Sequence, residues 1–196
     1  FRGLGGKAKH LKESAKLFAY NKLAESISIN RIRDVYPYEL FEEVGFTKEI
    51  SERSLYRNLE RIGDNYKFLM ENHQKFLKRN NLVSEKQFID FSSSYFEGNS
   101  SELGAIGYSR DSQPWKKQIV WGISTGINDI PTALTIQKGN VCDKKHFNFM
   151  LKTVRKVLDK NSLLIFDCGG NTRKNKGNVI CFGFNYLTLK AKQRSF

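Results

Sequence analysis

The stretch that decides the fold is Gln87–Glu97, QFIDFSSSYFE. Its aromatic and apolar residues favour a β-strand, and one carboxylate, that of Asp90, lies among them. Burying an unpaired charge is costly, so we expect Asp90 to have a function. A second aspartate, Asp167, ends the apolar run of Ser162–Gly170, SLLIFDCGG. We predict that the two carboxylates lie side by side.

The order of the predicted elements around these two aspartates indicates the fold. After residue 86 the pattern predicts strand, strand, strand, helix and strand. A helical crossover after a hairpin can return the fourth strand parallel to the first and next to it. This predicts an α/β chain with a partial ribonuclease H-like mixed sheet. The predicted ranges are 86–96, 117–125, 130–137, 144–159 and 162–166, with a helical turn and a last strand within 178–189.

Two converging carboxylates repel each other unless cations bridge them. Hard oxygen ligands favour Mg²⁺ or Mn²⁺, and we expect two such ions in the complete site. Each aspartate also has a plain structural interpretation. Asp90 could be a solvent-facing strand residue, and Asp167 could be a turn former before two glycines.

The amino-terminal region, residues 1–80, is predicted to be helical and to bind DNA, and residues 81–196 to form the catalytic region. A first helix is expected over 17–29. Pro37 and Gly45 enclose a second helix, and Ser51 can cap a third. Two short helices joined by a turn are typical of a helix-turn-helix, although a plain helical hairpin is the alternative. The residues of the third helix expected to contact DNA are Arg53, Arg57, Asn58 and Arg61.

The charge of the chain points to a polyanionic partner. The formal net charge is +13 and the isoelectric point is about 9.7, which favours a polyanion, most often a nucleic acid. The partner that we predict is double-stranded DNA. Basic character without such a partner is the alternative. Asp167 is the last acidic residue, so a basic segment follows it directly. The further residues expected to contact DNA are Arg110, Lys116, Lys117, Arg173, Lys174 and Lys176.

Other classes of protein are disfavoured. Three cysteines without CxxC spacing argue against a disulfide framework or a zinc site and favour a reducing compartment. No apolar run approaches 18 residues, so no membrane-spanning helix is expected. The chain begins with Phe1 rather than Met and shows no signal peptide, and we expect it to be a fragment of a longer protein.

Four motifs in collinear order resemble a known family. They are DFSSSYFEG, GYSRDSQPWKKQIVWGI, IPTALTIQKGNVCD and LLIFDCGGNT. Over about residues 50–190 the chain resembles prokaryotic insertion-sequence transposases of the DDE type. These are relatives of the enzyme that moves the transposon Tn-five, in the branch with a GYSRD-type loop.

The resemblance implies that Asp90 and Asp167 are the first and second catalytic carboxylates, with Gly170 and Asn171 following the second. Trp115 replaces an acidic residue that the family often has in its loop, so the contacts of that loop are expected to differ. The positions that match the loop and the turn before the crossover helix are Gly107, Ser109, Arg110, Asp111, Gly139, Asn140 and Asp143.

The third catalytic residue of the family is a glutamate on a later helix, and no acidic residue follows Asp167. The resemblance therefore implies an amino-terminal fragment that is inactive alone. The full enzyme would be a homodimer that binds transposon ends and target DNA and performs metal-dependent hydrolysis and strand transfer. A cytoplasmic, nucleoid-associated location is expected. The alternatives are a non-catalytic DNA-binding remnant or regulator, and a nuclease or resolvase that uses Glu97 as its third acid.

Overall fold

The computed structural model describes residues 10–98, 100–110 and 112–189. The described residues form two compact units, which divide between Leu69 and Met70 within helix α5 (Tyr66–Arg79). The predicted domain limits of 1–80 and 81–196 stay predictions. No helix in the described ranges is long and apolar enough to cross a membrane.

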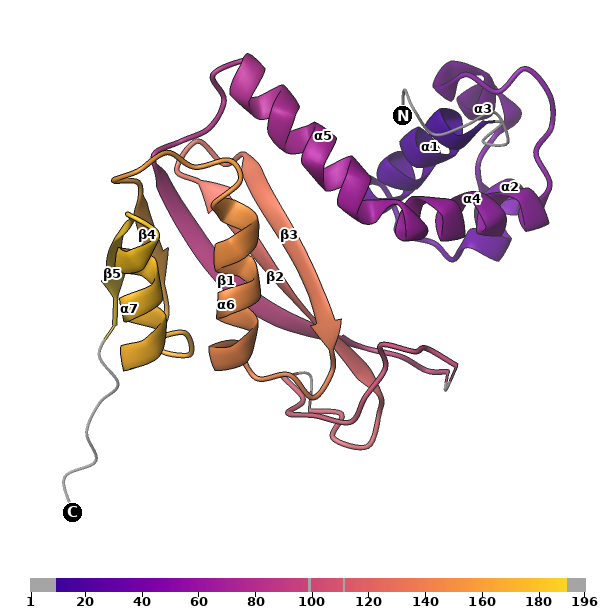
Figure 1. Ribbon diagram of the computed structural model, residues 1–196. Coiled ribbons are helices and arrows are strands. Elements are labelled where there is room, and N and C mark those ends of the chain that lie inside the picture. Colours follow the sequence, from indigo (N-terminus) through magenta and orange to yellow (C-terminus); the bar gives the residue numbers. More distant parts are fainter. Residues whose placement is uncertain (1–9, 99, 111, 190–196) are drawn as a thin grey trace. The chain divides into compact units, whose positions relative to one another are not determined.

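From residue 10 onward, the regular structure of the first unit is helical (Figure 1). It contains α1 (Leu11–Leu23), a 3₁₀ turn η1 (Ile29–Arg31), α2 (Ile32–Val35), α3 (Tyr38–Val44), α4 (Glu52–Asp64) and the beginning of α5. Helices α1 to α4 and the segment between α3 and α4 share one core, because each helix is too short to be stable without tertiary packing. The buried apolar residues of this core are Leu17, Ile32, Leu40, Phe41, Val44, Phe46, Ile50 and Leu55.

Local sequence signals set the ends of α3 and α4, as predicted. Pro37 precedes α3, and Gly45 ends it at a φ of 109°, which favours glycine. Ser51 caps α4, since its hydroxyl accepts the backbone N–H of Ser54 at 3.2 Å.

The first helix lies at Leu11–Leu23 instead of the predicted 17–29. The side chain of Asn21 explains the early end. It donates to the carbonyl of Ile27 at 2.8 Å and accepts the N–H of Ile27 at 3.1 Å. These bonds hold a turn in place of further helix.

The second unit is a five-stranded mixed sheet of order β3-β2-β1-β4-β5 (Figure 1). Neighbours β1, β2 and β3 run antiparallel, whereas β4 runs parallel to β1 and β5 parallel to β4. The predicted ribonuclease H-like arrangement, with the fourth strand beside the first, is therefore confirmed. The strands are β1 (Lys86–Tyr95), β2 (Gln118–Gly126), β3 (Pro131–Lys138), β4 (Leu163–Phe166) and β5 (Asn185–Thr188).

Helices α6 (Asp143–Val154) and α7 (Arg173–Cys181) supply the helical layer of this unit. Thr172 caps α7 by accepting the N–H of Asn175 at 3.0 Å, so the helix begins five residues before the predicted helical turn. The core between sheet and helices combines aliphatic side chains with several phenylalanine rings. Its main buried side chains are Ile89, Phe91, Phe147, Met150, Leu151, Val154, Leu164, Phe166 and Val179.

Strand β1 is buried on one side only. Its residues alternate, with Ile89 and Phe91 in the core, whereas Phe88 is 49% exposed and Asp90 is exposed. This alternation follows from the two-residue period of a strand, because α6 and α7 cover one face of the sheet. We call the side with Ile89 and Phe91 the covered face and the side with Phe88 and Asp90 the open face.

Candidate active site

The sheet brings Asp90 and Asp167 to neighbouring strands. In the parallel pairing of β1 with β4, the last matched residues are Ile89 and Phe166. Asp90 and Asp167 are the next residue in each segment, so their backbones lie next to each other at the end of the ladder. The element order predicted this placement.

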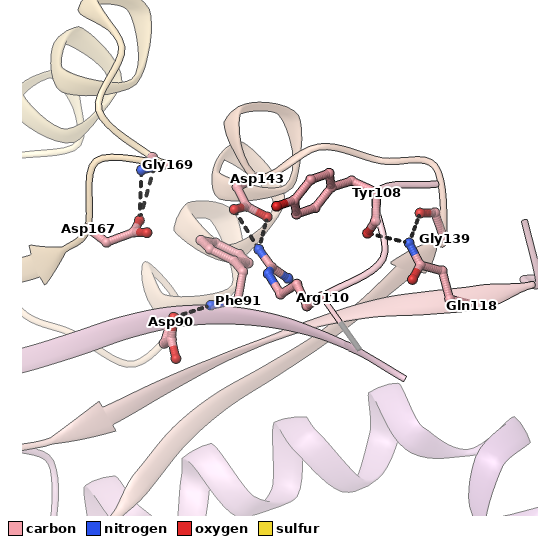
Figure 2. A network of polar contacts seen from close by, with 10 residues as sticks. Asp90, Phe91, Tyr108, Arg110, Gln118, Gly139, Asp143, Asp167 and Gly169 are labelled. Carbon is pink, nitrogen blue, oxygen red and sulfur yellow. Dashed lines mark hydrogen bonds and ion pairs between the residues drawn. The ribbon is translucent and has the colours of Figure 1, made fainter. Parts of the chain in front are cut away.

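The two carboxylates do not point toward each other (Figure 2). Oδ1 of Asp90 accepts the N–H of Phe91 at 2.8 Å, and Oδ1 of Asp167 accepts the N–H of Gly169 at 3.0 Å. Both side chains are exposed. Asp90 is therefore not the buried charge that the sequence predicted, because the strand turns this side chain to the open face.

Asp167 lines a pocket of about 380 Å³ beside the amino-terminal end of α6. The other walls come from the segment after β3, from the start of α6, from the loop between β1 and β2, and from β2 itself. Asp90 is not among the lining residues. These are Tyr108, Arg110, Val120, Gly139, Asn140, Val141, Cys142, Asp143 and Asp167.

Two polar side chains hold the loop against the pocket (Figure 2). Arg110 donates to both carboxylate oxygens of Asp143, at 2.7 and 2.8 Å. The buried amide of Gln118 donates to the carbonyl of Tyr108 at 2.8 Å and to that of Gly139 at 3.1 Å. The loop backbone is thus tied to both β2 and the start of α6.

Two glycines allow the loop to lie this close. A Cβ atom built on Gly107 would overlap the carbonyl oxygen of Gly139, and one built on Gly139 would overlap that of Gln118. Only glycine permits such an approach of two backbones. The resemblance had marked Gly107, Arg110, Gly139 and Asp143 only as motif positions, and the structure shows that they form one packed unit. Asp111 lies outside the described residues.

The predicted DNA-binding residues of α4 fall into two groups. Arg53 and Arg57 are exposed, and Arg61 is half-buried. Asn58 is only 3% exposed, and its Nδ2 donates to Ser14 Oγ of α1 at 2.8 Å. The predicted outward orientation of Asn58 is wrong, because Asn58 lies three residues after the buried Leu55 and faces α1.

Arg57 and Arg61 also line a surface pocket of about 380 Å³ in the first unit. The capping residue Ser51 and the neighbouring Lys48 contribute to it, and so does Glu49. The pocket therefore brings together basic side chains of α4 and of the segment before it, along with one carboxylate.

The other predicted DNA contacts lie on the second unit. Arg173 and Lys174 are exposed on the first turn of α7, and Lys176 is half-buried. Lys116 forms an ion pair with Glu97 at 2.6 Å and lies over the ring of Tyr95. Lys117 is half-buried. The carboxylate in this ion pair belongs to Glu97, the residue that the nuclease or resolvase alternative would use as its third acid.

His146 is a buried polar residue that no sequence motif had singled out. It is 1% exposed, and its Nε2 lies 2.8 Å from Thr135 Oγ1. Its ring centroid is 4.8 Å from that of Phe91, the neighbour of Asp90. Burial lowers the pKa of His146 to about 4, although the nearby Asp143 raises that pKa and Arg110 lowers it further. The imidazole is therefore neutral near pH 7.

The donor set at Asp90 and Asp167 consists of carboxylate oxygens, which suit Mg²⁺ or Mn²⁺. Within the described ranges, no group of three or more histidine, cysteine, aspartate or glutamate side chains could hold a metal ion. The chain thus presents two candidate ligands on adjacent strands and no third one in the part that the structure describes.

No family model matches the sequence, and no curated protein matches it either. Among solved structures, the chain is similar to the piggyBac transposase in a synaptic complex with hairpin DNA. The TM-score is 0.51 at 9% identity, over 100% of this chain and 46% of that one. It is also similar to the Mos1 transposase in a paired-end complex with the left transposon end. There the TM-score is 0.39 at 13% identity, over 97% of this chain and 62% of that one.

A paired-end complex of Mos1 with Mn gives a TM-score of 0.37 at 12% identity, over 89% of this chain and 58% of that one. The chain spans less than two thirds of each of these proteins. At 9% identity, the similarity to the piggyBac enzyme shows a shared fold alone. The chain has a helical amino-terminal region followed by a mixed sheet, in a fold similar to that of a transposase.

Proposed function

We propose that this chain is part of a DDE-type transposase that binds DNA and cuts and joins it with divalent metal ions. The observation that carries the proposal is the pairing of β1 with β4, which puts Asp90 and Asp167 one residue beyond its last matched pair. The fold similarity to the piggyBac transposase supports it. We further propose that the chain belongs to the prokaryotic insertion-sequence branch of these enzymes, and the four sequence motifs support this assignment.

Asp90 and Asp167 would hold the metal ions. Both side chains are exposed, and no described cation forms an ion pair with either, so their carboxylates are available to turn toward a shared ion. When bound, Mg²⁺ or Mn²⁺ would activate the attacking oxygen and stabilise the leaving oxygen of the phosphodiester. No acidic residue follows Asp167, so we expect this chain alone to lack strand-transfer activity.

Basic side chains on both units would bind the DNA backbone. Arg53 and Arg57 project from α4, and Arg173 and Lys174 from α7 just after Asp167. Phosphate contacts of this kind make affinity strongly dependent on salt. The piggyBac structure contains hairpin DNA, which supports a nucleic-acid ligand for this chain. The helix-turn-helix role of α3 and α4, the homodimeric full-length enzyme and the cytoplasmic location stay predictions.

Calorimetric titration with Mn²⁺ tests the metal site without requiring activity. We expect Asp90→Asn and Asp167→Asn each to abolish Mn²⁺ binding. Asp129→Asn is the matched control, since Asp129 is an exposed turn residue of the second unit with a φ of 61°, which asparagine also accepts. Binding that persists in both site variants would contradict the metal site.

Fluorescence anisotropy with labelled duplex DNA tests the second half of the proposal. Binding should weaken with added salt and with Arg53→Ala or Arg57→Ala. The regulator alternative makes a different prediction, namely DNA binding by a chain that takes up no Mn²⁺ at Asp90 and Asp167. The two titrations together therefore separate an enzyme fragment from a binding protein.

A further inference from the structure

Tyr108 is exposed on a segment of backbone that is otherwise held in place. Its side chain is 87% exposed, whereas its carbonyl accepts the amide N–H of the buried Gln118 at 2.8 Å. An exposed aromatic side chain leaves apolar surface in contact with water. Binding of a partner that covers the ring would remove this surface from water and would therefore be favourable. Tyr108 thus combines an exposed ring with a backbone that a hydrogen bond holds in place.

The residues on either side of Tyr108 hold the loop. Gly107 packs directly against Gly139, and Arg110 is paired with Asp143 at the start of α6. A ring presented from such a backbone needs little further ordering when it binds a ligand, because only its own side-chain torsions remain to be fixed. The loop therefore presents Tyr108 in a preorganised position.

The ring borders the pocket that contains Asp167. Figure 2 shows it beside Asp143 and Arg110, on the side of the loop that faces the start of α6. No other described aromatic ring stacks on it. Tyr108 is thus an open aromatic face next to a candidate catalytic carboxylate.

In the absence of a bound metal ion, the charges around the pocket argue against a phosphate as the ligand of this ring. The guanidinium of Arg110 is neutralised by Asp143 at 2.7 Å, and Asp167 adds a negative charge. The remaining walls include Val120 and Val141. A neutral, flat and partly apolar group fits these surroundings better than an anion does.

We propose that Tyr108 stacks on an unpaired nucleobase of the DNA beside Asp167. The inference rests on the proposed function, since it takes the ligand to be DNA. A base within an intact duplex has both faces covered by its neighbours, whereas an unpaired base has a free face for the ring. Stacking of this kind depends on the ring and not on the phenol hydroxyl, and it tolerates any base sequence.

Binding of two DNA probes in the absence of divalent cations tests the inference. One probe is a fully paired duplex, and the other carries a short single-stranded 3′ extension that contains 2-aminopurine, whose fluorescence falls on stacking. The wild-type chain and Tyr108→Phe should bind the extended probe more tightly and quench its fluorescence. Tyr108→Ala should bind it about tenfold more weakly, lose the quenching and bind the paired duplex like the wild type.

Trp115→Ala is the matched control. Trp115 lies in the same loop and is also 87% exposed, but it does not line the pocket. It should keep both the affinity and the quenching. Equal losses in Trp115→Ala and Tyr108→Ala would overturn the assignment to this pocket.

The remaining outcomes separate the inference from the proposed function. If Tyr108→Ala binds and quenches the extended probe like the wild type, the stacking role is wrong while DNA binding stands. If the wild-type chain binds neither probe, the proposed function fails and the inference fails with it.

Discussion

The two faces of the sheet differ in what surrounds their side chains. On the covered face, Ile89 and Phe91 pack against Phe147 and the rest of α6, and side chains there exclude water. On the open face, the same strand turns Asp90 to solvent. Neighbouring residues of one strand can therefore serve stability and chemistry separately, because successive side chains point to opposite sides. Substitutions on the two faces should differ both in magnitude and in the property that changes.

The largest effect is expected from Phe147→Ala on the covered face. Phe147 is fully buried and its ring lies 4.5 Å from that of Phe166, centroid to centroid. Removal of such a ring leaves a cavity and should lower the free energy of unfolding by about 3–5 kcal/mol.

Urea denaturation followed by circular dichroism measures this loss. Phe149→Ala is the matched control on the same helix, because Phe149 is 42% exposed, and its effect should stay near or below about 1 kcal/mol. Similar losses for both variants would contradict the division between the faces.

An intermediate effect on the free energy of unfolding is expected from a change in pH, because His146 of α6 is buried on the covered face of the sheet. Burial lowers the pKa of His146 from its ordinary value of 6.5 to about 4. The unfolded chain therefore binds the proton first as pH falls, and stability is lost between about pH 6.5 and about pH 4. The full loss from this group is about 3 kcal/mol.

Denaturant titrations of the wild type and His146→Gln across this range measure that contribution. Glutamine can keep a hydrogen bond to Thr135 and does not titrate there. The difference in unfolding free energy between the two proteins should change with pH below 6.5 and be constant above it. A difference that is constant throughout would show that His146 does not bind the extra proton on unfolding.

The smallest effect on stability is expected from Asp90→Asn on the open face. An exposed strand residue without an ion pair should change the unfolding free energy by less than about 0.5 kcal/mol in metal-free buffer. The same variant should lose Mn²⁺ binding, so stability and function would separate. A large loss of stability would instead assign Asp90 a structural role.

The errors of the sequence-based predictions fall on particular side chains. Apolar alternation predicted β1, and Ser51 and Gly45 predicted the ends of their helices, because such signals lie within a few residues of the structure that they set. Asn58 was expected to face DNA, yet it bonds to Ser14, 44 residues earlier in the chain. The sequence shows that Asn58 is polar and lies on a helix, but it does not show which distant residue the side chain contacts.

The sequence by itself determined the order of the strands and helices in the second unit and the two aspartates that this order brings together. Strand period, helix caps and crossover connections are local rules, and residues near one another in the chain express them. The tertiary structure alone decided the exposure of Asp90, the pairing of Arg110 with Asp143, the open ring of Tyr108 and the neutral His146. Each of these four properties depends on segments that are distant in the sequence and that bury or contact the side chain. Burial and contact determine whether a side chain is charged and whether it is accessible to a ligand.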